Sequence, residues 1–322
     1  MHPILRPGCH VLRRDRSQVQ IGLDPQQALI LPDNDDTRAT LALLARAADV
    51  QEYDGRHTLD LLQTHGLLLD AGTFLPLVPA CVDPMATQPV KAARPGRPRP
   101  QRHHVAALAR SAGDRAAAVI EARIRQPVEL RTYADTPDEI LAHSMADLLR
   151  ETGVQVTQAP APVPRSAHVP PATATSAPRV AALVGVGEPP RELVDGWMRG
   201  GVPHVLLRLT EGVATLGPFV VPGRTACVRC LDAHHTDTDP SWPLLVEQYA
   251  RLSANERSDG VPEPVDGLLV QVAVAWAARD LTSFLEDRTP STWSTTIRFD
   301  PHLTSLETRS WLRHPDCGCA WS

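Results

Sequence analysis

The chain has almost no lysine and few aromatic residues. Of its 32 basic residues only Lys91 is a lysine, and phenylalanine, tyrosine and tryptophan together make up 4% of the 322 residues. We attribute the arginine bias, together with the abundant alanine, to a GC-rich genome rather than to function. The formal net charge is −5, so overall charge gives no reason to expect nucleic acid or an anionic membrane surface as a partner.

Membrane and export signals are also missing from the sequence. No apolar run approaches the roughly 18–20 residues that cross a bilayer. The first residues, MHPILRPGCH, lack the apolar core and cleavage pattern of a secretory signal peptide. We therefore expect a cytoplasmic protein with no membrane partner. Thiols are normally reduced in that compartment, which favours a metal over disulfides for closely spaced cysteines.

Two pairs of cysteines suggest such a metal site. Cys227 and Cys230 form a CxxC motif, and Cys317 and Cys319 form a CxC motif near the end of the chain. Together they supply the four thiolates of a tetrahedral zinc site, and Gly318 allows the backbone to fold sharply within the second pair. Four cysteine ligands leave no open position for water, so we expect a structural zinc.

A redox-active CxxC is the alternative interpretation. It would need an adjoining thioredoxin-like βαβ unit and would leave Cys317 and Cys319 without a role. We interpret four further residues as non-ligands. His234 and His235 are expected to be loop histidines, and Cys9 and Cys81 to be single thiols.

Residues 1–83 have the element order of a winged helix. Polar and apolar residues alternate around a polar turn near Ser17, which predicts a hairpin, and Ala28–Leu31 follows as a short strand. Two helical patterns come next, one starting at a capping-type aspartate and one stopping at Gly66. Two short strands, LLLD and TFLPLV, would then form the wing, turning at residues 71–72.

Two segments rich in proline separate or interrupt the modules. Residues 84–103 contain four arginines that could grip phosphate, but no aromatic residues are interleaved for base stacking, so we interpret the segment as a solvated linker. Residues 159–178, APAPVPRSAHVPPATATSAP from Ala159, are expected to form a flexible loop.

Residues 104–322 alternate strand and helix, which predicts a doubly wound, mostly parallel sheet and thus an α/β fold. A strand from Ala214, a long helix from Gly267 and a terminal hairpin should follow. The long helix, 267–285, could be buried core or a homodimer seam. Core is favoured because apolar residues nearly encircle it. The earlier strands are expected at His104–Ala109, Val128–Thr132, Val154–Thr157, Arg179–Val184 and His204–Leu209, with helices near 114–125, 137–151 and 190–199.

The run HVLLRLTEGVATLGPFVVPGRTACVRCLDAHHTDTDPSWP (204–243), with the late cysteine pair, resembles the ThiF/MoeB-type activating-enzyme family. In particular, it resembles the cyclodehydratase-partner, or precursor leader peptide-binding, branch found with YcaO enzymes in thiazole/oxazole-modified peptide biosynthesis. The first 83 residues resemble the PqqD-like RiPP recognition element in element order and in the stretch THGLL.

This resemblance implies what an active member would need. Such members adenylate a carboxylate with a GxGxxG loop after the first strand and a lysine on the nucleotide. In the stretch HVAALARSAGDRAAAVIEARI only Gly113 is in place, and Lys91 sits in the linker. The GxG of Gly185 and Gly187 follows the fourth predicted strand rather than the first. We therefore expect a degenerate domain that does not bind ATP productively and is not an enzyme.

The resemblance implies a peptide-binding scaffold. A precursor peptide would add as a strand beside Ala28–Leu31 and lie against the helix at 58–64, while the zinc-bearing domain docks a YcaO-type cyclodehydratase. The alternative is that all four residues of Ala28–Leu31 belong to the hydrophobic core and contact no peptide. The peptide-binding residues expected on this basis are Ala28, Leu29, Ile30, Leu31, Leu59 and Leu62.

Two other functions are weighed against this one. An active ATP-dependent adenylyltransferase conflicts with the missing glycine loop and lysine. A winged-helix DNA-binding regulator would use a basic wing at Arg13, Arg14 and Arg16, but its second helix, TLDLLQTHG, carries no basic residue to reach DNA. ThiF/MoeB relatives are commonly dimers, so a homodimer is also considered.

Overall fold

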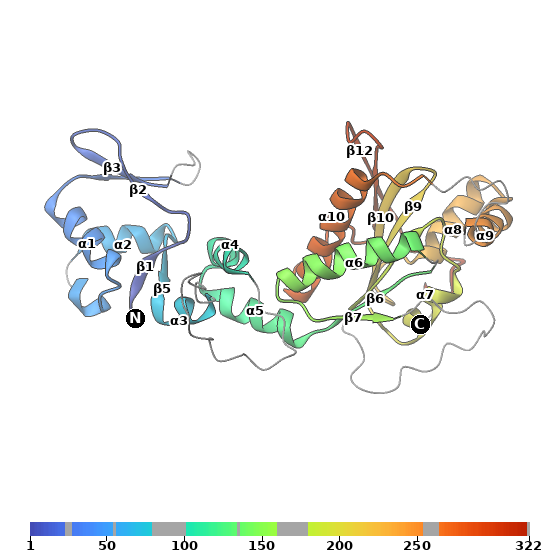
Figure 1. The fold of residues 1–322 in the computed structure, drawn as a ribbon, viewed down its shortest axis with the longest axis horizontal. Helices are drawn as coiled ribbons and strands as arrows, with labels where there is room; N and C mark the ends of the chain where they lie inside the picture. Colours follow the sequence, from blue (N-terminus) through green and yellow to red (C-terminus); the bar gives the residue numbers. More distant parts are fainter. Residues whose placement is uncertain are drawn as a thin grey trace, which may run out of the picture. The chain divides into compact units, whose positions relative to one another are not determined.

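The computed structural model describes residues 1–22, 28–53, 56–78, 101–133, 136–159, 180–253 and 264–320. It divides into two units, Met1–Glu121 and Ala122–Ser322, and we describe each by itself (Figure 1). Apart from residues at their ends, the predicted linker 84–103 and the predicted loop 159–178 lie outside the described residues, as does Cys81.

The first unit contains a three-stranded antiparallel sheet. Its strand order is β2-β3-β4, which confirms the predicted hairpin and the strand that follows it. Ile21 and Leu31 of this sheet are buried in the core of the unit, together with residues from both helices that come next. The strands are β2 (Val11–Arg13), β3 (Gln18–Ile21) and β4 (Leu29–Pro32), and the helices are α1 (Asp35–Ala45) and α2 (His57–Thr64).

The start of α1 is fixed by a side-chain cap. The side chain of Asn34, rather than an aspartate, accepts the N–H of Thr37 and caps α1. The unit also holds a strand that the sequence did not predict. This strand, β1 (Pro3–Leu5), pairs antiparallel with β5 (Leu68–Asp70).

The second predicted wing strand, TFLPLV, is wrong. Residues of this stretch form α3 (Ala71–Phe74) and a single 3-10 turn, Leu75–Leu77. The reason is local, because the carboxylate of Asp70 accepts both the N–H and the hydroxyl of Thr73 and thereby starts a helix. The winged-helix assignment stays a prediction.

The predicted strand His104–Ala109 is also wrong. Residues there form α4 (Arg102–Ala112), and after a 3-10 turn α5 (Ala116–Arg125) follows. Val105, Leu108 and Ala109 are all buried, and their spacing of three and four residues is that of one helix face. Gly113 ends α4 with φ +58°, and a Cβ there would lie 2.5 Å from the Arg6 guanidinium. The positive φ therefore accounts for a glycine at this turn.

The second unit is built on one seven-stranded sheet of order β12-β11-β10-β9-β8-β6-β7. The strands from β7 to β9 are parallel, and each later pair is antiparallel. The predicted α/β fold with a mostly parallel sheet is thus confirmed. The strands are β6 (Val128–Arg131), β7 (Val156–Ala159), β8 (Val180–Val186), β9 (His204–Thr210), β10 (Val213–Val220), β11 (Thr295–Phe299) and β12 (Leu306–Ser310).

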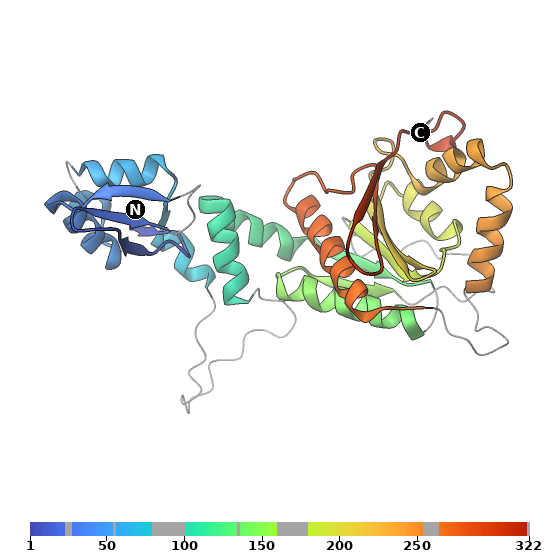
Figure 2. The ribbon, with the colours of Figure 1, turned by 90° about the horizontal axis from the view of Figure 1, so that it is seen from above.

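Helices cover both faces of this sheet (Figures 1 and 2). Ala182 and Val184 of β8 belong to the core cluster that α6 (Thr136–Glu151) and α10 (Gly267–Leu285) share. The alternate residues Ala181 and Leu183 pack in a second cluster with α7 (Glu192–Arg199). Two more helices, α8 (Val228–Thr238) and α9 (Trp242–Ser253), follow β10. Burial on both faces explains why β8 is apolar throughout.

By length and composition alone α10 could cross a membrane, yet 56% of its apolar window is buried in the protein. The buried Asp280 on this helix accepts the N–H groups of Ser291 and Thr292. Its apolar residues belong to the main core of the unit, as expected for a core helix.

Candidate metal centre and neighbouring polar network

Four cysteine sulfurs meet in the second unit. The Sγ of Cys227 lies 3.8 Å from that of Cys230 and 3.6 Å from that of Cys317, and the Sγ atoms of Cys230 and Cys319 are 3.3 Å apart. All four lie within 4.8 Å of one another. A Zn–S bond of about 2.3 Å puts tetrahedral sulfurs about 3.8 Å apart. The four predicted ligands are therefore brought together at spacings that could hold a metal ion.

Two segments of the chain position these sulfurs, one before the CxxC motif and one before the CxC motif. After β10, the hydroxyl of Thr225 accepts the N–H of Val221 and closes a turn. Cys227 then occupies the N-cap position of α8. On the other side, Arg313 donates to the carbonyls of Gly223 (2.9 Å) and Cys319 (2.6 Å). This guanidinium ties the turn before the CxxC motif to the CxC motif.

The sulfurs lie in an apolar shell. Cys227, Cys230 and Cys317 are buried with Trp311 and Leu231. The hydrogen bond from the Cys227 thiol lowers the pKa of Cys230 to about 4, whereas the pKa of Cys227 is raised and burial raises that of Cys319 to about 12. Without a cation, ionisation is opposed at Cys227 and at Cys319. A divalent metal would supply the charge that lets all four ionise.

The two histidines predicted to lie in a loop are on α8 instead. The ring of His235 stacks on Trp242 with centroids 4.4 Å apart. The ring of His234 meets His314 edge-on, and its Nε2 donates to the Leu312 carbonyl. Neither is drawn into the cysteine cluster.

His234, Asp237 and His314 form a second group whose possible ligand atoms lie within 4.8 Å of one another. The Nδ1 of His314 accepts the N–H of Asp316, so its Nε2 carries the proton that it donates to Asp237 at 3.0 Å. This hydrogen bond accounts for the group without a metal.

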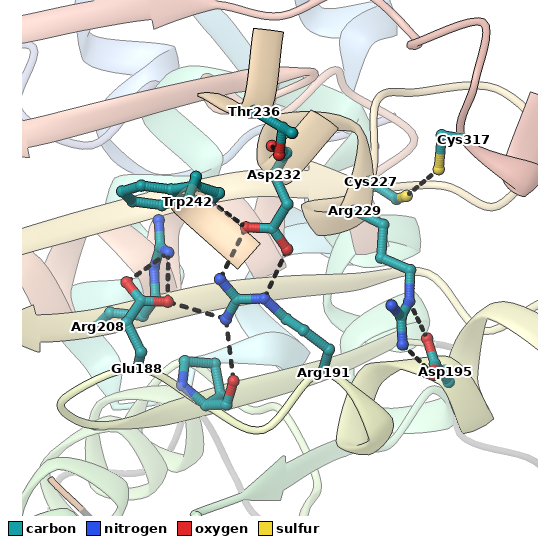
Figure 3. A network of polar contacts seen from close by, with 11 residues as sticks. Glu188, Arg191, Asp195, Arg208, Cys227, Arg229, Asp232, Thr236, Trp242 and Cys317 are labelled. Carbon is teal, nitrogen blue, oxygen red and sulfur yellow. Dashed lines mark hydrogen bonds and ion pairs between the residues drawn. The ribbon is translucent and has the colours of Figure 1, made fainter. Parts of the chain in front are cut away.

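A network of mostly buried charges lies beside the cysteine cluster and was not predicted (Figure 3). Arg191, which precedes α7, makes two hydrogen bonds of 2.7 and 2.9 Å to Asp232 on α8. Its third nitrogen donates to Glu188 at 2.9 Å. Glu188 also accepts from Arg208 on β9 at 2.9 and 3.0 Å, and the Trp242 indole donates to Asp232. The network connects the end of β8 with β9 and α8.

The charges in this network compensate one another. Burial alone would raise the pKa of Glu188, but the guanidinium groups of Arg208 and Arg191 hold it below its ordinary value. Burial opposes the ionisation of Asp232 in the same way, and Arg191 outweighs it, so the pKa of Asp232 is also lowered. Both carboxylates are therefore ionised at neutral pH.

The nucleotide crevice expected of an α/β sheet lies where the strand order reverses, here between β6 and β8. Tyr133, just after β6, donates its hydroxyl to the carbonyl of Gly187, just after β8, at 2.8 Å. Since β6 is the first strand of this sheet, the place of a glycine loop is 132–135 and not the 104–124 stretch inferred from sequence. Its residues, TYAD, include no glycine.

The predicted peptide-binding residues have different surroundings. Leu31, Leu59 and Leu62 are buried in the core of the first unit, whereas Ile30 is 45% exposed. Ala28 and Leu29 are partly buried. Within the described ranges β4 pairs only with β3, so no strand lies on its outer edge.

No family model and no curated protein matches the chain. Solved structures similar to the chain include those of a heterocyclase and of MccB. The heterocyclase TruD gives a TM-score of 0.62 at 17% identity over 99% of this chain and 42% of the TruD chain. E. coli MccB with AMPCPP and MccA gives 0.57 at 13% identity over 100% of both chains. This chain thus spans about two fifths of the heterocyclase chains that it matches. At these identities the likeness shows the fold, which is consistent with the expected MoeB-like type.

Proposed function

We propose that the chain is a non-catalytic scaffold. It binds the leader of a ribosomal precursor peptide and presents that peptide to a YcaO-type cyclodehydratase in thiazole/oxazole-modified peptide biosynthesis. The observation that carries the proposal is the outer edge of β4, which has no strand partner in the described part of the first unit. The likeness to the heterocyclase TruD and to MccB, solved with MccA, supports it at the level of fold.

The edge of β4 suits strand addition. An added peptide strand gains main-chain hydrogen bonds from the edge and side-chain selectivity from alternate residues. Ile30 offers an exposed apolar contact, while Leu31 beneath it is held in the core. Leu59 and Leu62 would then support the site from inside rather than touch the peptide.

Zinc, in this proposal, is structural. When bound it would cross-link the start of α8 to the end of the described chain through Cys227, Cys230, Cys317 and Cys319, whose sulfur spacing fits a tetrahedral ion. All four ligands are thiolates, which is the composition of closed structural sites. The domain so fixed would dock the cyclodehydratase.

Three features argue against adenylation. The Tyr133 hydroxyl bridges the crevice to the Gly187 carbonyl, residues 132–135 contain no glycine, and Lys91 is the only lysine of the chain. The alternative, an active adenylyltransferase, predicts magnesium-dependent ATP binding. Calorimetry on the zinc-loaded protein tests it directly. Saturable ATP binding would overturn the non-catalytic part of the proposal.

A matched pair of variants tests peptide capture. Ile30 on β4 and Val11 on β2 are both 45% exposed and lie on opposite edges of one three-stranded sheet. Peptides would first be selected against the full chain from a random library displayed on phage. Ile30→Glu should weaken the selected peptides about tenfold or more, through a charge placed where an apolar contact forms, whereas Val11→Glu should not. Equal losses would place the site elsewhere.

The partnership is tested separately. Heterocycle formation by a YcaO-type enzyme on a core peptide fused to a selected sequence should rise when this chain is added. The increase should fall with Ile30→Glu and persist with Val11→Glu. Peptide binding with no effect on heterocycle formation would contradict the partnership and leave capture intact.

A further inference from the structure

Strand β12 forms one edge of the seven-stranded sheet (Figure 1). All five of its residues are exposed, and in the part of the chain that the structure describes β12 pairs only with β11. Proteins commonly block such edges with proline, a bulge or charged side chains. The strand has no proline, and its register with β11 is regular at all five positions. Its two charges, Glu307 and Arg309, have opposite signs, so the register of a further strand decides whether they repel or attract it.

The ladder with β11 decides which main-chain groups of β12 point outward. The carbonyl of Ser305 accepts a hydrogen bond of 3.3 Å from the residue that follows β11, and the N–H of Trp311 donates one of 2.7 Å to the residue that precedes it. Hydrogen bonding in an antiparallel pair alternates along the strand, so positions 307 and 309 also bond to β11. The main-chain groups that point to the outer edge are those of Leu306, Thr308 and Ser310.

A second copy of the same strand fits this edge in one register. Centring an antiparallel pair of β12 strands on Thr308 joins Leu306 to Ser310 and uses all the outward groups. It also sets Glu307 of each copy opposite Arg309 of the other, in the non-hydrogen-bonded pairs whose side chains lie closest. Centring the pair on Glu307 or on Arg309 would instead put that charge opposite the same charge of the second copy, which is unfavourable.

Exposed apolar residues flank these charges. Leu306 is 49% exposed and Leu312 is 80% exposed, the largest value for a large apolar side chain among the described residues. In the register centred on Thr308, Leu312 is diagonal to Leu306 of the second copy, and long side chains reach diagonal neighbours. The same pairing that matches the charges thus also covers these two side chains.

We infer that two copies of this chain associate through β12, about a two-fold axis at Thr308, and so join their sheets into one. The same patch of each copy meets itself, as in other two-fold dimers. Two short strands form a small contact, so the association is weak and depends on concentration. The inference goes beyond the proposed scaffold role and does not depend on it.

Sedimentation of the zinc-loaded full chain tests the association at protein concentrations from about 1 to 500 µM in low salt. The average mass should rise with concentration toward that of two chains. It should fall again when salt is added, because exposed charges are then screened. A monomer at every concentration would overturn the inference.

Charge exchange tests the register. Glu307→Arg and Arg309→Glu should each weaken self-association about tenfold or more, because each sets like charges opposite one another at two places. Mixed together, the two variants should associate again, since every cross-strand pair is then of opposite charge. Arg309→Glu also removes the guanidinium from its place over the Trp311 ring, a loss that mixing does not repair. Mixed variants that stay monomeric would overturn the register.

Two further variants separate the strand edge from general effects. Arg150→Glu makes the same charge change as Arg309→Glu in the last turn of α6 and should leave self-association unchanged; an equal loss would overturn the assignment to β12. Thr308→Pro removes an outward N–H while keeping the bonds to β11, as edge strands tolerate, and should abolish the dimer. An unchanged dimer in Thr308→Pro would place the contact elsewhere. Zinc content is measured on every sample, so a loss of fold is recognised.

Discussion

Two arginine–aspartate pairs join the same two regions of the second unit and differ mainly in burial. Arg191, just before α7, pairs with Asp232 on α8, and Arg229 on α8 pairs with Asp195 on α7. Both pairs are bidentate. The Arg191 side chain is 11% exposed, and that of Arg229 is 49% exposed. We predict that removing Arg191 is far more destabilising than removing Arg229.

The magnitude follows from what each substitution leaves behind. Arg191→Met leaves two mostly buried carboxylates, Glu188 and Asp232, without one of their partners. Removing one partner of a fully buried pair costs about 3–5 kcal/mol. Glu188 keeps Arg208, and Asp232 keeps the Trp242 indole, so we expect the lower end, about 3 kcal/mol. Arg229→Met breaks a pair that water already screens and should cost about 0–1 kcal/mol.

The assay is urea unfolding of zinc-loaded protein at one fixed free zinc concentration. All six tryptophans lie beyond residue 196, so their fluorescence reports the second unit alone. Adding Asp232→Asn to Arg191→Met should restore part of the lost stability, because it removes one stranded charge. Losses that agree within about 0.5 kcal/mol for Arg191→Met and Arg229→Met would refute the reasoning, since burial would then not decide the energy.

Three further predictions follow from the same structure. The cost of Arg191→Met should shrink on acidification. Glu188 and Asp232 have lowered pKa values, so their stabilisation is complete above their ordinary values of 4.5 and 3.8 and is lost as the pH falls from these values through the lowered ones. Urea unfolding at pH 7 and at about pH 3 checks this, and a constant difference would contradict it. Cys227→Ser should abolish zinc binding and destabilise the second unit, whereas Cys9→Ser, at another buried thiol, should keep about one zinc per chain by elemental analysis. Gly217→Ala should strongly destabilise the protein in thermal unfolding, because the added Cβ would lie 2.2 Å from the Thr295 carbonyl oxygen and the residue has φ +95°. Gly196→Ala is the control, since Gly196 lies inside α7 with open space around it. It should stabilise the protein by up to about 1 kcal/mol.

The meeting of the four cysteines could be predicted from the sequence because their spacing is typical of metal ligands. Pairs of cysteines in CxxC and CxC motifs supply the thiolates of tetrahedral zinc sites. The parallel strands β8 and β9 were predicted for a similar reason, since short apolar runs between helical patterns are typical of buried strands.

The failures have physical causes that the residues show. In HVAALA the apolar residues Val105, Leu108 and Ala109 repeat at helical spacing, a signal that a short β-like run obscured. The stretch after Asp70 looked like a strand, but one side-chain cap starts a helix there. Strand β1 was missed because its partner β5 lies more than sixty positions further along the chain.

The buried ion network was beyond any local pattern. Glu188 and Arg191 are three residues apart, and only that pair could be proposed from spacing. Arg208 and Asp232 come from β9 and α8, and the fold alone brings them to the end of β8. The Nε2 of His204 has no hydrogen-bond partner among the described residues, and this too could not be predicted from the sequence, because burial and the direction of one hydrogen bond create it.

One helix connects these findings. Over little more than one turn, α8 carries Arg229, Cys230 and Asp232, which take part in the exposed ion pair, the cysteine cluster and the buried network. The end of β8 is thereby fixed to α8 through Arg191, while the Tyr133 hydroxyl ties it to the end of β6. An adenylating enzyme needs this edge free to admit phosphates. Here Tyr133 and Arg191 already bind groups at this edge, which is consistent with the non-catalytic scaffold proposed above.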